Sequence, residues 1–139
     1  MRLIAALMLV AAPALAQELP VVQLSAGMHL IRAEVAGDYS SRGRGLMHRK
    51  SLGANAGMLF IFDAAAIHCM WMKNTYIPLS VAFVDAQGAI INIADMQPHS
   101  EQSHCAARPA LYALEMTQGW FAERGVQPGM KLGGFDKLK

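Results

Sequence analysis

The chain has 139 residues, and its 12 Lys and Arg residues are nearly balanced by 10 Asp and Glu residues. This length suits a single domain. The balanced charge gives no electrostatic basis for binding nucleic acid or an anionic membrane surface, so we expect neither as a partner.

The chain begins with the features of a secretory signal peptide. Residues 1–2 give it a basic start, residues 3–12 are apolar, and small residues lead to Ala16. This pattern predicts removal of residues 1–16, which leaves Gln17 as the first residue of the mature protein. The apolar run is too short to span a bilayer, which takes about 20 residues. We therefore expect a periplasmic or secreted protein without a transmembrane segment after signal removal.

The first part of the mature chain predicts two strands and a helix. Residues 17–27 form a leader with a short strand, and residues 28–139 form a single β-rich domain. Met28 to Val35 alternates in polarity as a strand does. Asp38 can then cap a helix over residues 39–48, although two glycines within that stretch weaken it.

The remaining elements are mostly strands. Gly57 to Phe62 is a continuous apolar run, which is typical of a strand covered on both faces. The other expected elements are an extended segment at 68–73, a hairpin of 79–84 and 89–93, a polar loop at 97–109, a strand at 110–116, a short helix at 119–124 and a closing strand at 129–132. Together they predict a mainly β fold, either a compact sandwich or a distorted barrel with one or two short helices.

The two cysteines, Cys69 and Cys105, predict a disulfide. An even number of cysteines in an exported chain favours pairing, because the compartment is oxidising. Two free thiols or a metal-binding pair are the alternatives. A paired state also excludes a thiolate nucleophile.

The segment at 68–73 contains soft metal ligands. Strand alternation places His68, Met70 and Met72 on one face, and imidazole and thioether groups are suitable ligands for Cu(I). Core packing explains the same residues, because methionine fills irregular cores. We therefore expect no metal or cofactor, and copper handling is kept only as an alternative.

Two polar features lie next to apolar strands. Lys73, Asn74 and Thr75 follow the extended segment, where polar groups often line a pocket, although ordinary turn chemistry explains them equally well. Glu115 lies inside the apolar strand ALYALEM, where a carboxylate is costly to bury without a partner. Lys73 is our preferred partner and Arg44 the alternative, unless Glu115 simply faces water.

Common catalytic motifs are missing from the sequence. It has no glycine-rich phosphate loop, no G-x-S-x-G elbow and no H-E-x-x-H. No pattern identifies a pair of catalytic carboxylates. Whether the protein is an enzyme stays open, and the sequence favours a protein that is not.

Several ordered motifs resemble one family. RGLMHRKSL, GMLFIF and CMWMKNTYIPLSVAFVD, followed by LEM and GW, are similar to the family called domain of unknown function 192, from about Ala33 to Lys131. The resemblance implies a compact, mostly β domain that is commonly exported and has no established activity. Members often carry an acid after the last glycine, whereas here Met130 follows Gly129.

The resemblance also favours a shared polar site. The polar residues that fit the family pattern are Arg49, Lys73, Asn74, Thr75 and Glu115. Our leading hypothesis is an exported, non-enzymatic binding or interaction module for an unknown small ligand or envelope protein. An enzyme that uses Glu115 as acid or base on an envelope polymer or saccharide is the first alternative, and a copper-handling protein is the second.

Overall fold

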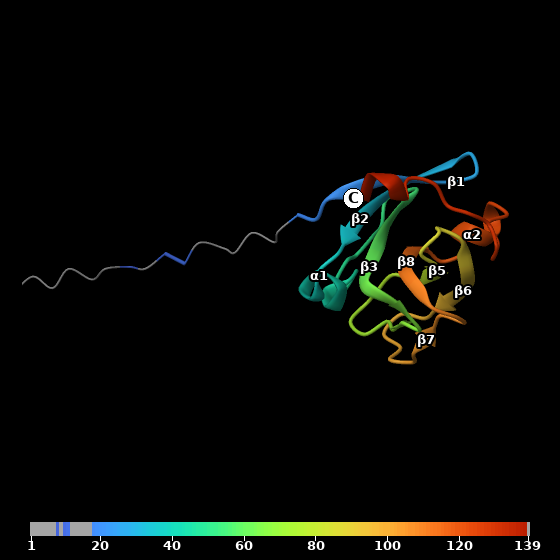
Figure 1. Cartoon of the computed structure of the whole chain (residues 1–139). Coiled ribbons are helices and arrows are strands. Elements are labelled where there is room, and N and C mark those ends of the chain that lie inside the picture. The colour runs from blue at the N-terminus through green and yellow to red at the C-terminus, as the bar shows by residue number, and fades with distance from the viewer. Residues whose placement is uncertain (1–7, 9, 12–17, 139) are drawn as a thin grey trace, which may run out of the picture.

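A single mixed β-sheet dominates the protein (Figure 1). The computed structural model describes residues 8, 10–11 and 18–138, so the predicted signal cleavage site lies outside the described residues. The six strands run in the order β1-β2-β3-β8-β5-β6. Their bounds are β1 (Val21–Ala26), β2 (His29–Ala36), β3 (Ala56–Ala66), β5 (Leu79–Val84), β6 (Ile90–Met96) and β8 (Ala110–Thr117). No helix within the described ranges is long and apolar enough to cross a bilayer.

The parallel pair β2–β3 is connected through the helix α1 (Tyr39–Arg44). Asp38 caps this helix as predicted, because its carboxylate accepts a 2.7 Å hydrogen bond from the Ser41 amide. The helix is shorter than the expected 39–48, since Gly45 adopts a φ of 50° and the chain turns there. This turn brings the residues after α1 back over the sheet.

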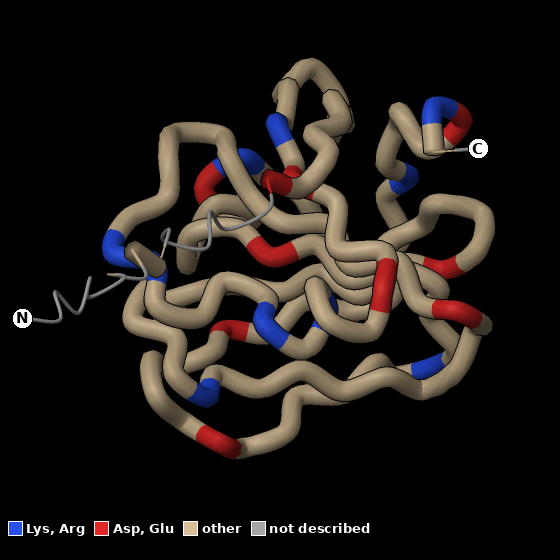
Figure 2. Tube along the Cα trace, turned by 90° about the vertical axis from the view of Figure 1, so that its left-hand side faces the viewer, with Lys and Arg blue, Asp and Glu red and all other residues tan. Residues whose placement is uncertain are grey.

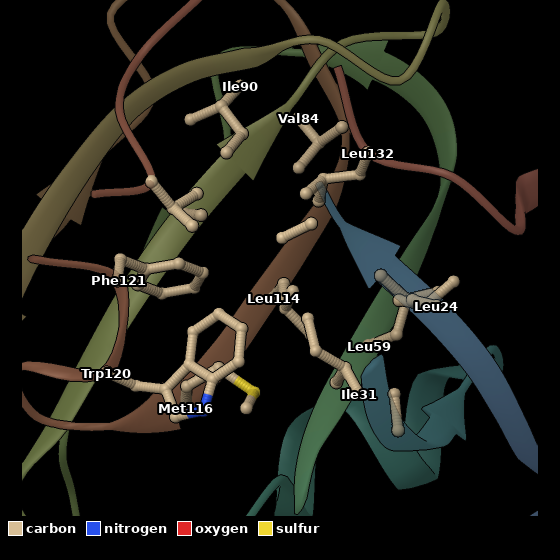
Figure 3. Close-up of a cluster of buried hydrophobic side chains, with 14 residues drawn as sticks. Leu24, Ile31, Leu59, Val84, Ile90, Leu114, Met116, Trp120, Phe121 and Leu132 are labelled. Carbon is tan, nitrogen blue, oxygen red and sulfur yellow. The ribbon is translucent and has the colours of Figure 1, made fainter. Parts of the chain in front are cut away.

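Apolar residues cover both faces of the sheet. One cluster, shown in Figure 3, combines Leu24, Ile31 and Leu114 with Trp120 and Phe121 of the short helix α2 (Trp120–Glu123). The second cluster lies on the opposite side of the alternating strands and includes Leu46, Met58, Phe60, Met72, Val81, Met96 and Ala113. All six residues of β5 are buried, and so is the apolar start of β3, as the continuous apolar runs indicate.

The sheet does not close into a barrel, but the C-terminal segment approaches both of its edges. Gly133 forms an isolated bridge with Ser25 of β1, and Lys131 forms one with Ala89, directly before β6. The closing strand expected at 129–132 is therefore a bridging segment, which ends in the 3₁₀ helix η1 (Phe135–Leu138).

A second, two-stranded sheet contains β4 (Cys69–Met70) and β7 (His104–Cys105). Cys69 and Cys105 are paired residues in this sheet, and their sulfur atoms are bonded at 2.03 Å, so the predicted disulfide is present. The expected strand at 68–73 is much shorter, because the Thr75 amide turns back to bond the Met72 carbonyl at 3.1 Å.

Candidate functional site

Glu115 is a carboxyl group buried in the middle of the sheet. It lies on β8 between two strands, opposite Met58 of β3 and Val81 of β5, and it is only 3% exposed. Among the described residues, its side chain has neither a hydrogen-bond partner nor an ion-pair partner within 4.0 Å. Burial alone raises the pKa of Glu115 to about 8, because desolvation penalises its charged form.

A small cavity, which we call the Glu115 cavity, connects this carboxyl group to the outside. Its volume is about 30 Å³, above the roughly 10–15 Å³ that a cavity needs to hold one water molecule. Arg44 and Met47 line it from α1 and the following turn, and Lys73 and Thr75 line it from the connection between β4 and β5. Arg44 and Thr75, which are 31 positions apart in the sequence, therefore meet over one acid.

Two glycines allow the chain to pack tightly near Glu115. Gly57 lies opposite Met116, and a Cβ atom there would collide with the Met116 side chain and the Glu115 carbonyl. Gly45 has a positive φ, and a Cβ atom there would lie 3.2 Å from the Phe60 ring. Gly45 lines the Glu115 cavity, so the wall there depends on a missing side chain, whereas Gly57 allows β3 and β8 to pack closely beside Glu115.

The structure corrects the expected ion pair between Lys73 and Glu115. None of the ion pairs in the described part of the chain includes either residue. Lys73 is exposed, and its Nζ atom lies 5.3 Å from the centre of the Trp71 ring, where the aromatic face attracts the cation. Arg44 forms no ion pair within the described residues either, so Glu115 has neither of its two expected partners.

Thr75 forms a hydrogen bond within its own loop, and Asn74 faces solvent. The Thr75 side chain is buried, and its hydroxyl donates a 3.0 Å hydrogen bond to the Lys73 carbonyl, which is turn chemistry. Asn74 is exposed, has a φ of 52° and does not line the Glu115 cavity. Of the predicted site residues, Lys73, Thr75 and Glu115 share the cavity, with Asn74 beside it.

Arg49 lies apart from that group. Its guanidinium donates two hydrogen bonds of 2.9 Å to the Glu34 carboxylate, and this pairing raises the pKa of Arg49. It lines a neighbouring cavity of about 610 Å³, which borders the Glu115 cavity through the shared residues Arg44, Gly45 and Met47. Arg49 is therefore placed at the larger opening rather than at the acid.

An aromatic cluster next to this corner was missed by sequence reasoning. The Tyr76 hydroxyl lies 3.0 Å from His48 Nδ1, and the Tyr76 ring also contacts the His99 ring at a centroid distance of 5.2 Å. The cluster combines residues from three loops, and no spacing in the sequence relates them. The residue types also do not predict the loop conformations that bring these three residues together.

The residues considered for copper binding are used in packing. The Nε2 atom of His68 lies 2.8 Å from the Ala64 carbonyl, and its ring stacks on Phe62 with centroids 3.8 Å apart. Met72 is fully buried in the second apolar cluster. Their surroundings favour the packing interpretation.

The fold and the cavity define a small mixed-sheet domain built around an unpaired buried acid. The chain belongs to the family domain of unknown function 192, described as "Uncharacterized ACR", whose model matches residues 21–134. This confirms the resemblance seen in the sequence motifs. No curated protein matches the chain.

Two solved structures are similar to this protein. A putative transcription regulator from Sinorhizobium meliloti 1021 is 38% identical, with a TM-score of 0.77, over 82% of this chain and 92% of the other. A protein of unknown function from Novosphingobium aromaticivorans DSM 12444 is 33% identical, with a TM-score of 0.79, over 89% of this chain and 91% of the other. Both similarities extend across nearly the whole domain.

Proposed function

We propose that this protein is an exported binding module that takes the polar end of a small ligand or partner segment into the Glu115 cavity. The observation that carries this proposal is a buried carboxyl group without a protein partner that borders an opening. No described residue donates to or accepts from the Glu115 carboxyl group, so this group is free to bond to a ligand that enters the cavity.

The exported location rests on the sequence and on the disulfide. Residues 1–16 have the pattern of a removable signal peptide. The Cys69–Cys105 bond is compatible with an oxidising compartment, where such bonds persist. A binding module in the cell envelope would meet small molecules and protein segments directly.

Binding is favoured over catalysis by the surroundings of Glu115. Its raised pKa, about 8, would suit a general acid or base near neutral pH. However, Glu115 is the only carboxylate among the described residues that line its cavity. Hydrolysis of a saccharide by the common mechanism uses two carboxylates across the scissile bond. One acid in so small a space is better suited to holding a group than to cleaving one.

The name of the Sinorhizobium meliloti structure suggests gene regulation, but the charges here favour a different partner. Figure 2 shows Lys and Arg interspersed with Asp and Glu along the described trace. Proteins that bind DNA usually gather basic residues on one face or along one helix. We therefore propose a small ligand or protein segment rather than nucleic acid.

Native mass spectrometry of the protein purified from the periplasm tests the proposal. We expect the wild-type protein to carry a non-covalent adduct that denaturation releases. Glu115→Leu, which removes the hydrogen-bonding group, should lose the adduct, whereas Glu101→Gln at an exposed loop position should retain it. A wild-type protein with identical native and denatured masses would contradict the proposed function.

A further inference from the structure

We propose that the group that enters the Glu115 cavity is a carboxylate, which accepts a hydrogen bond from the Glu115 side chain while Arg44 and Lys73 balance its charge at the rim. This inference rests on the proposed function, because it names the chemistry of the ligand for the same site. Three features of the cavity support it: the donor at its floor, the charges at its rim and its size.

The floor of the cavity offers a hydrogen-bond donor. Glu115 is nine-tenths or more buried and has no partner among the described residues. The raised pKa, about 8, keeps the group mainly protonated at neutral pH. A protonated carboxyl has one O–H donor, and its bond to an anionic oxygen is short and strong. The matching ligand atom is therefore an anionic oxygen.

The rim of the cavity carries positive charge that no protein acid balances. Arg44 ends α1, Lys73 lies in the opposite loop, and neither forms an ion pair within the described part of the chain. Arg42 is different, because its guanidinium is paired with Asp63 at 3.2 Å. An ammonium ligand would approach two cations and would have to ionise a buried acid. An anion would instead meet the positive charges of Arg44 and Lys73 at the rim and the hydrogen-bond donor of Glu115 at the floor.

The size of the cavity favours a flat end group on a longer molecule. A volume of about 30 Å³ suits the edge of a planar carboxylate better than a tetrahedral phosphate. The neighbouring cavity of about 610 Å³ shares Arg44, Gly45 and Met47 with it and has room for the body of the ligand. A free organic acid and the C-terminus of a peptide both present this chemistry.

An NMR titration of the oxidised mature protein identifies the end group. The probes are sodium acetate, methylammonium chloride and sodium phosphate at constant ionic strength and pH 6.5, observed through the backbone amides. We expect acetate alone to shift the amides of Gly45, Thr75 and Glu115 in a saturable way. Acetate affinity should fall about tenfold per pH unit above the pKa of Glu115, because only the protonated form donates.

Variants distinguish the contribution of the Glu115 hydrogen-bond donor from that of the positive charges of Lys73 and Arg44. Glu115→Gln retains an N–H donor, so it should bind acetate at every pH and lose the pH dependence of the affinity. Glu115→Leu should abolish binding, and its amide spectrum reports whether the fold is intact. Lys73→Met and Arg44→Met should each weaken acetate binding several-fold, whereas Lys131→Met, which lies away from the cavity, should leave it unchanged.

The source of the carboxylate is distinguished by a peptide probe. N-acetylglycylglycine that binds at least tenfold more tightly than acetate indicates a peptide C-terminus, and equal affinities indicate a free acid. The corresponding peptide amide should not bind in either case.

Two results would overturn the carboxylate inference and leave the proposed function intact. One is saturable binding of methylammonium that Glu115→Gln abolishes. The other is a native adduct lost in Glu115→Leu while acetate and the peptide fail to bind. Absence of both probe binding and a native adduct would contradict the inference and the proposed function together.

Discussion

The backbone amide of His48 donates a 2.9 Å hydrogen bond to the carbonyl of Asn74, and both residues have left-handed backbones, with φ values of 65° and 52°. His99 repeats the arrangement, with a φ of 65° and a 3.1 Å bond from its amide to the Thr75 carbonyl. Non-glycine residues in this conformation cost about 1–2 kcal/mol each. Their concentration here indicates that the surrounding loops hold the corner beside the Glu115 cavity in one shape.

Substitution of Asn74 tests this backbone constraint separately from the side chain. Asn74→Ala should lower the free energy of unfolding by about 1 kcal/mol, because alanine tolerates a positive φ less well than asparagine. Asn74→Gly should stay within about 0.5 kcal/mol of the wild type, since glycine adopts this conformation freely. Urea denaturation followed by circular dichroism measures both. Equal stabilities of the two variants would show that the backbone at Asn74 is not constrained.

Glu115 should make the stability of the protein depend on pH. Its pKa is raised from 4.5 in the unfolded chain to about 8 in the folded protein, so the folded state holds a proton that the unfolded state has lost. The stability contribution is complete below pH 4.5 and is lost as the pH rises to about 8. Glu115→Gln should therefore gain several kcal/mol relative to the wild type across this window.

Urea denaturation of both proteins at a series of pH values measures this difference. Glu101→Gln, at an exposed position, is the control and should follow the wild-type curve. Parallel curves for the wild type and Glu115→Gln would mean that Glu115 is not the buried titrating group.

The disulfide should contribute to stability through the unfolded chain. Cys69 and Cys105 are 36 residues apart, and closing a loop of that length is worth about 4 kcal/mol in the chain-entropy model. The double variant Cys69→Ser with Cys105→Ser should lose stability of this order, as should the reduced wild type. Alkylation followed by intact-mass measurement checks the pairing, and two modified thiols without reductant would refute it.

Processing of the exported protein should occur after Ala16. N-terminal sequencing of protein from the periplasm should begin at Gln17, or find a blocked end where Gln17 has cyclised to pyroglutamate. Replacing Ala14 and Ala16 with bulky residues should leave the signal attached, because the cleavage site needs small residues. Full-length protein confined to the cytoplasm would be inconsistent with export.

The strands were largely predictable because their patterns are local. The apolar run from Gly57 and the hairpin around DAQG correspond to β3, β5 and β6, and the helix cap at Asp38 is also present. The predicted helix was too long because the positive φ at Gly45 ended it. The strand expected at 68–73 was cut short by the turn at Met72 to Thr75. In both cases a backbone turn overrode the side-chain pattern.

The site was only partly predictable, since it depends on how distant segments meet. The apolar neighbours of Glu115 indicated that it could be buried, and Lys73 and Thr75 were placed near it. The absent ion pair could not be foreseen, because it depends on Lys73 lying against Trp71. The cluster of His48, Tyr76 and His99 arises from loop conformations that residue spacing does not encode.

The C-terminal segment that bridges the sheet also bears on aggregation. Ser25 exchanges two backbone hydrogen bonds with Gly133, of 3.1 and 2.9 Å, and Ile90 bonds to residues 129 and 130 at 2.7 and 2.9 Å. These bonds occupy edge groups that would otherwise pair with strands of neighbouring molecules. A chain cut after Pro128 would uncover both edges at once. The segment after Pro128 therefore protects the sheet edges from association between copies of the protein. An affinity tag should be added after this segment and should not replace it.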